Sequence, residues 1–235
     1  MGTGWNEMSP DRTNGLDDIT VVVINYRTLD LTERCITSLR LHYPQVQLLV
    51  SDNGSADEST EYLRGLGKAD PYARVILHKR NLHHGPALHH AVQVAGTTLV
   101  FSLDSDCQVL QAGFLERMRC AFEDPAVYAV GRLAIMNRFG YELDATQPGS
   151  LGYIHPAAML LDRQKYLHLK PFRHHGSPCL ANMHSAARAG WRLVDFPVRD
   201  FIYHQGRGTC ARHGYDLGWR HVAEYLLNRW LKTKW

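Results

Sequence analysis

The chain has 235 residues, of which 45% are hydrophobic and 21% charged. This balance is typical of a globular protein with one large domain or two small ones. The formal net charge of +3 is too small to indicate nucleic-acid binding, and no apolar run approaches the roughly 18 residues of a transmembrane helix. The five cysteines are an odd number without C-x-x-C spacing, which predicts free thiols in a cytoplasmic protein.

Strands and helices are expected to alternate through the first half. The polar residues 1–18 predict a flexible leader. The apolar strands that follow are expected at 19–26, 46–52, 74–79 and 98–106, and the helices at 31–42, 55–66 and 85–95. Ser55 and Glu58 have the spacing of a capping box at the start of the second helix. Alternation of this kind predicts an α/β fold, with a mostly parallel sheet covered by helices on both faces.

The second half is less regular. A strand is expected at 126–136, a strand and a helix within 152–169, and a helix and a strand within 180–198. In the tail, 219–235, apolar residues recur every three or four positions among basic ones, which predicts an amphipathic helix. This helix would pack on its own domain, form a homodimer contact, or lie as a peripheral segment on the inner face of a membrane. Without an internal repeat or a linker, a single domain is expected.

Polar residues follow three of the strands in the first half. Asn25 and Tyr26 end the first, Asp52 and Asn53 the second, and the stretch 104–106 the fourth. Parallel strands present their carboxyl ends at one edge of the sheet, where ligands of such sheets bind. We therefore expect these residues to converge on one site.

The stretch VFSLDSDCQVL, residues 100–110, places two carboxylates at the end of a buried strand. Asp104 and Asp106 are two residues apart, so a continued strand would direct both to one side. Two like charges this close call for a cation, and hard oxygen ligands suit Mg²⁺ or Mn²⁺. Taken alone, this D-x-D motif fits a solvated turn equally well.

Three stretches occur in the order and spacing of one known family. They are VVVINYRTLDLTERCITSL, LLVSDNGSADES and NLHHGPALHHAVQVAGTTLVFSLDSDC. Together they resemble the nucleotide-binding half of the family 2 glycosyltransferases, which have the GT-A fold. The resemblance covers about residues 19–107 and continues more weakly, through GYIHPAAMLLDRQKYLHL, ARAGWRL and YHQGRGT, to about residue 209. It implies a nucleotide-sugar-binding half at 19–107 and an acceptor half at 108–218.

The resemblance also implies roles for matching residues. Tyr26 would stack on the nucleobase, and Asp52 would accept a hydrogen bond from it, with Asp57 supporting the loop. Asp104 would face the ribose or the sugar. The metal, Mg²⁺ or Mn²⁺, would be ligated by Asp106, with Asp104 and His204 beside it. The rim residues Asn25, Asn53 and Ser105 complete the expected donor site.

The chain departs from this family at the catalytic base. Inverting members usually carry Glu-Asp about a dozen residues before a Gly-aromatic pair, which is Gly190-Trp191 here. That position holds Pro178-Cys179, and no carboxylate lies between residues 170 and 192. Because histidine is a competent base near neutral pH, we expect His174 or His175 to take the proton, with His155 in reserve.

The resemblance predicts an inverting glycosyltransferase that uses a nucleotide-diphosphate sugar, with UDP weakly favoured by Tyr26 and Asp52. The acceptor would be a carbohydrate, a lipid-linked molecule or a small molecule. The missing base motif leaves open a protein that binds nucleotide sugars without transferring them. A sugar nucleotidyltransferase is disfavoured because VINYRTLDL, residues 23–31, contains no glycine. The histidines of HHGPALHHA, residues 83–91, lack cysteine or acid partners, so we expect them at the donor pocket or in solvent rather than on zinc.

Overall fold

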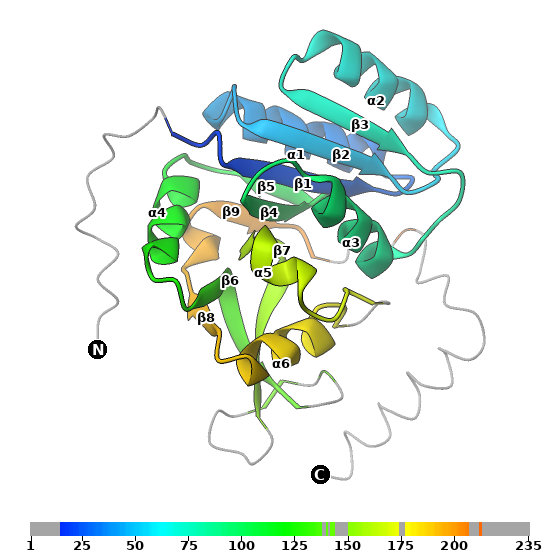
Figure 1. Cartoon of the computed structure of the whole chain (residues 1–235). Helices are drawn as coiled ribbons and strands as arrows, with labels where there is room; N and C mark the ends of the chain where they lie inside the picture. Colours follow the sequence, from blue (N-terminus) through cyan, green and yellow to red (C-terminus); the bar gives the residue numbers. More distant parts are fainter. Residues whose placement is uncertain are drawn as a thin grey trace.

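A seven-stranded mixed sheet forms the centre of the computed structural model, which describes residues 15–137, 140, 142–143, 150–173, 177–206 and 212 (Figure 1). In spatial order the strands are β3 (Ala73–Leu77), β2 (Gln47–Asp52), β1 (Ile19–Asn25), β4 (Leu99–Asp104), β7 (Leu151–Asp162), β6 (Val127–Met136) and β8 (Arg192–Asp195). A second, two-stranded sheet pairs β5 (Cys107–Val109) with β9 (Ile202–His204).

The first four strands of the chain run parallel. β1 pairs in parallel with β2 and β4, and β2 with β3. Only β7 runs antiparallel to its neighbours β4 and β6 in the seven-stranded sheet. The register places Asn25 opposite Asp52, and Ile24 opposite Asp104. The polar strand ends therefore meet at one edge, as the sequence predicts.

Helices cover both faces of the sheet because each presents an apolar stripe to it. On one face, α1 (Leu29–His42), α2 (Glu58–Ala69) and α4 (Phe114–Cys120) bury residues such as Ile36, Leu63 and Phe114. On the other, α3 (His84–Val94), α5 (Arg163–Leu167) and α6 (Leu180–Arg188) contribute Leu88 and Met183 to a second core. The expected single-domain α/β fold with a mostly parallel sheet is confirmed. Two 3₁₀ helices, η2 (Ala121–Glu123) and η3 (Val198–Asp200), complete the described elements.

Two expected element boundaries are wrong. The second helix begins at Glu58, with Asp57 as its N-cap, whose side chain accepts from the amide of Ser59 at 3.0 Å. The hydroxyl of Ser55 instead accepts from Nδ2 of Asn25, at the end of β1, and from the amide of Arg27. The strand expected at 98–106 ends at Asp104, and a turn at residues 105–106 leads into β5. Because β5 belongs to the second sheet, the chain leaves the plane of β4 at the D-x-D motif.

Several expectations lie outside the described residues: the tail at 219–235, His174 and His175, and most of the leader. Residues 15–18 of the leader are described and are attached to the domain. Leu16 packs against the core, and Asp18 forms an ion pair with Arg119 at 2.8 Å. The limits of the two halves remain predictions. In the described part of the chain, no helix is both long and apolar enough to cross a membrane.

Candidate functional site

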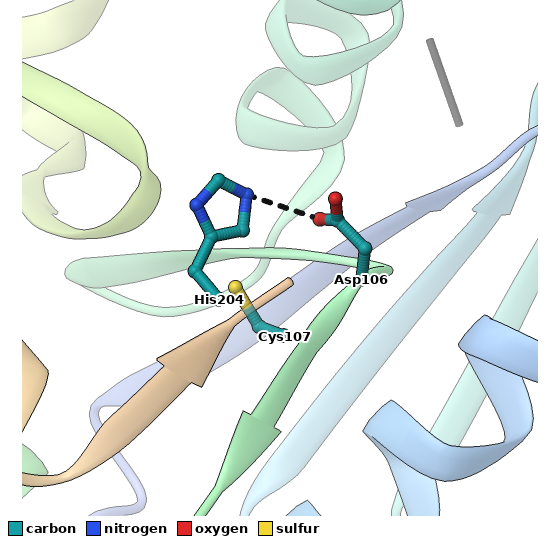
Figure 2. A group of neighbouring side chains, drawn as sticks. All are labelled: Asp106, Cys107 and His204. Atoms are coloured by element: carbon teal, nitrogen blue, oxygen red, sulfur yellow. Dashed lines mark ion pairs between the residues drawn. The ribbon is translucent and has the colours of Figure 1, made fainter. Parts of the chain in front are cut away.

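The centre of the site is the pair formed by Asp106 and His204. Asp106 lies in the turn before β5, and His204 ends β9, the strand that pairs with β5. The Nε2 atom of His204 is 3.2 Å from Oδ1 of Asp106, and Figure 2 shows the imidazole ring pointing at the carboxylate. The hydrogen bond to Asp106 raises the pKa of His204. Pairing of two strands distant in sequence thus brings the two side chains together.

Asp104, at the end of β4, contacts a different histidine. Its Oδ1 is 3.6 Å from Nε2 of His84, in the first turn of α3. Asp104 and Asp106 are therefore separated by the turn and have different partners. Charge from both carboxylates reaches the buried thiol of Cys35 and, after the larger effect of burial, raises its pKa. The two acids create a negative region at this edge, which suits a cation.

Cys107 lies next to the Asp106–His204 pair. One ligand atom each of Asp106, Cys107 and His204 lies within 4.8 Å of the others. Figure 2 shows the three side chains next to one another. The thiol is buried, however, and donates to the carbonyl oxygen of Ala157 at 3.5 Å. Burial raises the pKa of Cys107 well above its usual value. The ligands presented are thus a carboxylate and an imidazole, which with Asp104 nearby fit Mg²⁺ or Mn²⁺.

A buried hydrogen-bond network orders the loop after β2. The Nδ2 atom of Asn25 donates to Oδ1 of Asp52 at 3.0 Å and to the Ser55 hydroxyl at 3.1 Å. Ser55 also donates to Asp52. The hydroxyl of Thr32 donates to Asn25 at 2.7 Å, and that of Thr60 to Oδ2 of Asp52 at 3.1 Å. Asp52 is 2% exposed, so its first function is to fix this loop, while Oδ2 keeps a second lone pair.

A second network joins this loop to the start of α3. The Nδ2 atom of Asn53 donates to Oδ1 of Asn81 at 2.9 Å, and the amide of Leu82 donates to Oδ1 of Asn53 at 2.9 Å. The amide of His83 also donates to Asn81, at 2.7 Å. Asn53 therefore positions the loop that carries His84 toward Asp104.

Backbone in the left-handed region gathers at the same edge. Among non-glycine residues with described placement, Arg27, Ala56 and His83 have positive φ angles of 53°, 52° and 69°. Such angles are uncommon for residues with a Cβ and are often found at functional sites. Arg27 lies between β1 and α1, Ala56 between β2 and α2, and His83 directly before α3.

Tyr26 and Asp57 lie at the outer part of this edge. The guanidinium of Arg27 is 5.4 Å from the centre of the Tyr26 ring, a cation–π distance. Asp57 is the N-cap of α2. Ser105, in the turn between the two acids, is 4% exposed.

A cavity of about 340 Å³ opens beside the Asp106–His204 pair. His155, on β7, lines it together with His204, and the two ring centres are 6.0 Å apart. Burial lowers the pKa of His155, so its imidazole is neutral at neutral pH and can accept a proton. Sequence reasoning missed the cavity's other walls, Leu110, Arg132, Arg199 and Tyr203, because only the tertiary pairing of β5, β6, β7 and β9 brings them together.

The histidines near α3 do not form one cluster. His84 contacts Asp104, whereas Nδ1 of His89 is 2.6 Å from the hydroxyl of Tyr166. His90 packs its ring against His78 at 5.2 Å. Within the described residues, the only group of three or more potential metal ligands is the one at Asp106.

The structure also gives the positions of Arg212 and Cys179. Arg212 binds the carboxylate of Asp30 on α1, with one of its two contacts at 2.8 Å, and so interacts with an acid rather than with the edge of the sheet. Cys179, at the position of the usual base, is buried and caps α6. Burial raises the pKa of its thiol, so Cys179 is no substitute for the base.

Comparison with protein families gives one match. The family model described as glycosyl transferase family 2 matches residues 20–179, more than half of the chain. A comparison with curated protein sequences gives no significant match.

Solved structures share the fold at low sequence identity. A mannosyltransferase from Pyrobaculum calidifontis, PcManGT, in complex with GDP-Man and Mn²⁺, has 19% identity and a TM-score of 0.61 over 81% of this chain and 57% of its own. S. aureus TarS 1–349 in complex with UDP-GlcNAc has 13% identity and a TM-score of 0.58 over 79% and 58%. GalNAc-T7 with UDP, GalNAc and Mn²⁺ has 11% identity and a TM-score of 0.64 over 79% and 42%. The chain thus spans about half the length of these structures, and the likeness concerns the fold.

Proposed function

Since the chain belongs to glycosyltransferase family 2, we propose that it transfers a sugar from a nucleotide-diphosphate donor to an acceptor hydroxyl. The observation that carries this proposal is the arrangement of the carboxyl edge. A carboxylate–imidazole pair, a second acid and an ordered polar loop lie at the ends of β1, β2 and β4. This is the position where parallel α/β sheets bind nucleotide ligands.

In this proposal Asp106 and His204 hold a divalent metal ion, with Asp104 beside it. Both ligand atoms are already adjacent, and their oxygen and nitrogen donors suit Mn²⁺ or Mg²⁺. The structures of PcManGT and GalNAc-T7 are described with Mn²⁺. When bound, such an ion neutralises the charge that develops on a departing diphosphate.

The donor would extend from this pair across the loops after β1 and β2. Tyr26 offers an aromatic face for the nucleobase, and Asp52 offers the remaining lone pair of Oδ2 to a base N–H. Asn25 and Asn53 act on the donor through the loops they order. Asp57 and Ser105 are the remaining residues of the proposed donor site. A UDP-sugar is the favoured donor, as the sequence predicts, and the related structures bind both UDP and GDP sugars.

A histidine is proposed as the general base of an inverting transfer. His155 lines the cavity beside the Asp106–His204 pair. Because burial lowers its pKa, its imidazole is neutral at neutral pH and can accept the proton of an acceptor hydroxyl. Asp162, a carboxylate that could be considered instead, pairs with Leu99 at the opposite end of β4 and is too far from the site. His174 and His175 remain candidates and lie outside the described residues.

Calorimetry with nucleotides tests the proposal. We expect UDP to bind in the presence of Mn²⁺ and to lose most of its affinity when EDTA removes the metal. GDP and dTDP serve as comparisons for the base. Absence of binding by every nucleoside diphosphate with Mn²⁺ or Mg²⁺ would refute the proposed donor site.

The second candidate function is binding of a nucleotide sugar without transfer, favoured by Pro178-Cys179 at the position of the usual base. Incubation with UDP-sugars and Mn²⁺, followed by measurement of UDP release with and without acceptors, separates the two. Nucleotide binding with no release under any condition would support the binding protein.

A further inference from the structure

The cavity beside His204 combines positive charge with apolar walls. Two arginines, Arg132 and Arg199, and two histidines line it, and none of the described residues that line it is a carboxylate. Leu110 and Tyr203, which are 54% and 52% exposed, lie at the same cavity. They are two of the four exposed large hydrophobic residues in the described part of the chain. Concentration of exposed apolar surface at one cavity is typical of a binding site.

The charge of the arginines is directed at this cavity. Arg199 and Arg132 both line it, and Arg132 lies on β6. Its partner Glu142 is 3.7 Å away and both side chains are exposed, so this pair is weak and exchangeable. Arg199 forms no ion pair with any residue that the structure describes. An anion entering the cavity would therefore meet two guanidinium groups that are not held by strong internal pairs.

The cavity is separate from the proposed donor site. Tyr26, Asp52 and Asn53, the residues proposed to meet the nucleotide, do not line it, whereas His155 and His204 do. The cavity therefore meets the proposed donor site only at the Asp106–His204 pair. The acceptor hydroxyl must lie beside this pair to reach the sugar. A volume of about 340 Å³ is at the small end of ligand pockets and suits part of a larger molecule.

We propose that this cavity binds the acceptor, and that the acceptor carries a phosphate or carboxylate group next to an apolar group. The guanidinium groups of Arg132 and Arg199 would bind the anionic oxygens, for which their planar forks are well suited. Leu110 and Tyr203 would cover the adjacent apolar part. Identification of the ligand as an acceptor rests on the proposed glycosyl transfer, whereas the binding of such an anion does not.

Octyl phosphate is the probe, compared with octyl glucoside, which lacks the charge, and with inorganic phosphate, which lacks the apolar chain. Binding is measured by calorimetry on the full chain saturated with UDP and Mn²⁺, so that the donor site is closed to the probe, and on the chain with EDTA alone. We expect octyl phosphate to bind about ten-fold or more tightly than either comparison compound, since each supplies only part of the interaction. Octanoate in place of octyl phosphate distinguishes a phosphate site from a carboxylate site.

The variant Arg199→Gln is expected to weaken octyl phosphate by about ten- to a hundred-fold, as loss of a charge-assisted hydrogen bond does. Binding of UDP with Mn²⁺ should be unchanged. Arg64→Gln, on the exposed surface of α2, removes the same charge away from the cavity and should change neither. Circular dichroism confirms that both variants fold.

Three results would overturn the inference: equal binding of octyl phosphate and octyl glucoside, unchanged octyl phosphate binding in Arg199→Gln, or a loss of UDP binding in that variant. The last result would assign the arginine to the donor. If octyl phosphate binds as expected but UDP does not bind with any metal, the anion site stands and the proposed glycosyl transfer fails.

Discussion

At the scale of single residues, the pair Asp106–His204 carries the proposed chemistry. The resemblance predicts both residues, but their contact depends on the pairing of β5 with β9, two strands of three residues each. Strands so short have almost no periodic signal in sequence. The proposed roles of Arg132 and Arg199 could not be predicted from the sequence either. Arginines are common on protein surfaces, and only the folded chain shows which of them line a cavity.

Replacing Asp106 with asparagine tests the metal ligand. Asp106→Asn keeps the size of the side chain and removes the charge that faces the metal. We expect the affinity for UDP in the presence of Mn²⁺ to fall at least about 100-fold, which exceeds the usual effect of replacing a residue that only supports a metal ligand. The affinity for UDP measured with EDTA should change little. Asp17→Asn, an exposed acid before β1 at the opposite end of that strand, serves as the control. Equal affinity of Asp106→Asn and wild type would remove Asp106 from the site.

The base is tested with three single variants, His155→Ala, His174→Ala and His175→Ala. Loss of a general base typically lowers turnover about 10²–10⁴-fold. We expect one variant to show this loss while its affinity for UDP and Mn²⁺ stays within two-fold of wild type, because the base contacts the acceptor only. Calorimetry and a UDP-release assay measure the two quantities. Three variants with wild-type turnover would exclude a histidine base.

At the scale of elements, the sequence predicts most of the helices and strands but not how the chain leaves them. Apolar runs of strand length in alternation with helical periodicity are strong signals, so β1, β2, α1 and α3 are found where expected. The motif at 104–106 was expected to continue a strand, yet β4 ends at Asp104, because β5 pairs with β9 instead. Ser55 fits a capping box by spacing, yet its hydroxyl bonds with Asn25 and Asp52, so a tertiary network overrides the local pattern.

The loop between β2 and α2 offers a test of this network. Gly54 has φ of +77°, and a Cβ there would come within 2.7 Å of the Cα of Arg80. Gly54→Ala should therefore displace the loop and lower the free energy of unfolding by about 1–3 kcal/mol. We also expect it to weaken UDP binding, because Asn53 and Ser55 flank the glycine.

Gly65 provides the matched control in the neighbouring helix. It lies within α2, and a Cβ there would meet nothing within 4 Å. Gly65→Ala should raise the free energy of unfolding by up to about 1 kcal/mol. Urea denaturation measures both variants. A Gly54→Ala protein as stable as wild type, with full UDP binding, would show that the loop does not need this conformation.

At the scale of the whole molecule, partly buried histidines make stability depend on pH. Burial lowers the pKa of both His78 and His89 below the ordinary value of 6.5. As the pH falls below 6.5, the unfolded chain takes up protons first, so the free energy of unfolding decreases. His204 acts in the opposite sense and in another window, because its raised pKa contributes stability that is lost as the pH rises above 6.5.

We expect urea denaturation to show this decrease between about pH 7 and about pH 5.5. The double variant His78→Asn, His89→Asn should have a flatter dependence over the same range. His168→Asn, at an exposed histidine beyond α5, should keep the wild-type slope. A double variant with the full wild-type slope would assign the pH dependence to other groups.

The order of strands in the sheet follows from the same alternation that the sequence shows, because right-handed crossovers through α1, α2 and α3 leave few arrangements for β1 to β4. The later part was less predictable. The sequence predicts a strand in this segment but not its neighbours: β7 inserts antiparallel between β4 and β6 and so carries His155 into the site. Long-range pairing of this kind depends on the complete core and has no local signature.

Anomalous diffraction at the manganese absorption edge, from crystals grown with UDP and Mn²⁺, tests the central claim most directly. We expect a manganese peak ligated by the carboxylate of Asp106 and the imidazole of His204, beside the diphosphate of UDP. A manganese peak elsewhere, or bound UDP with no metal at these two residues, would contradict it.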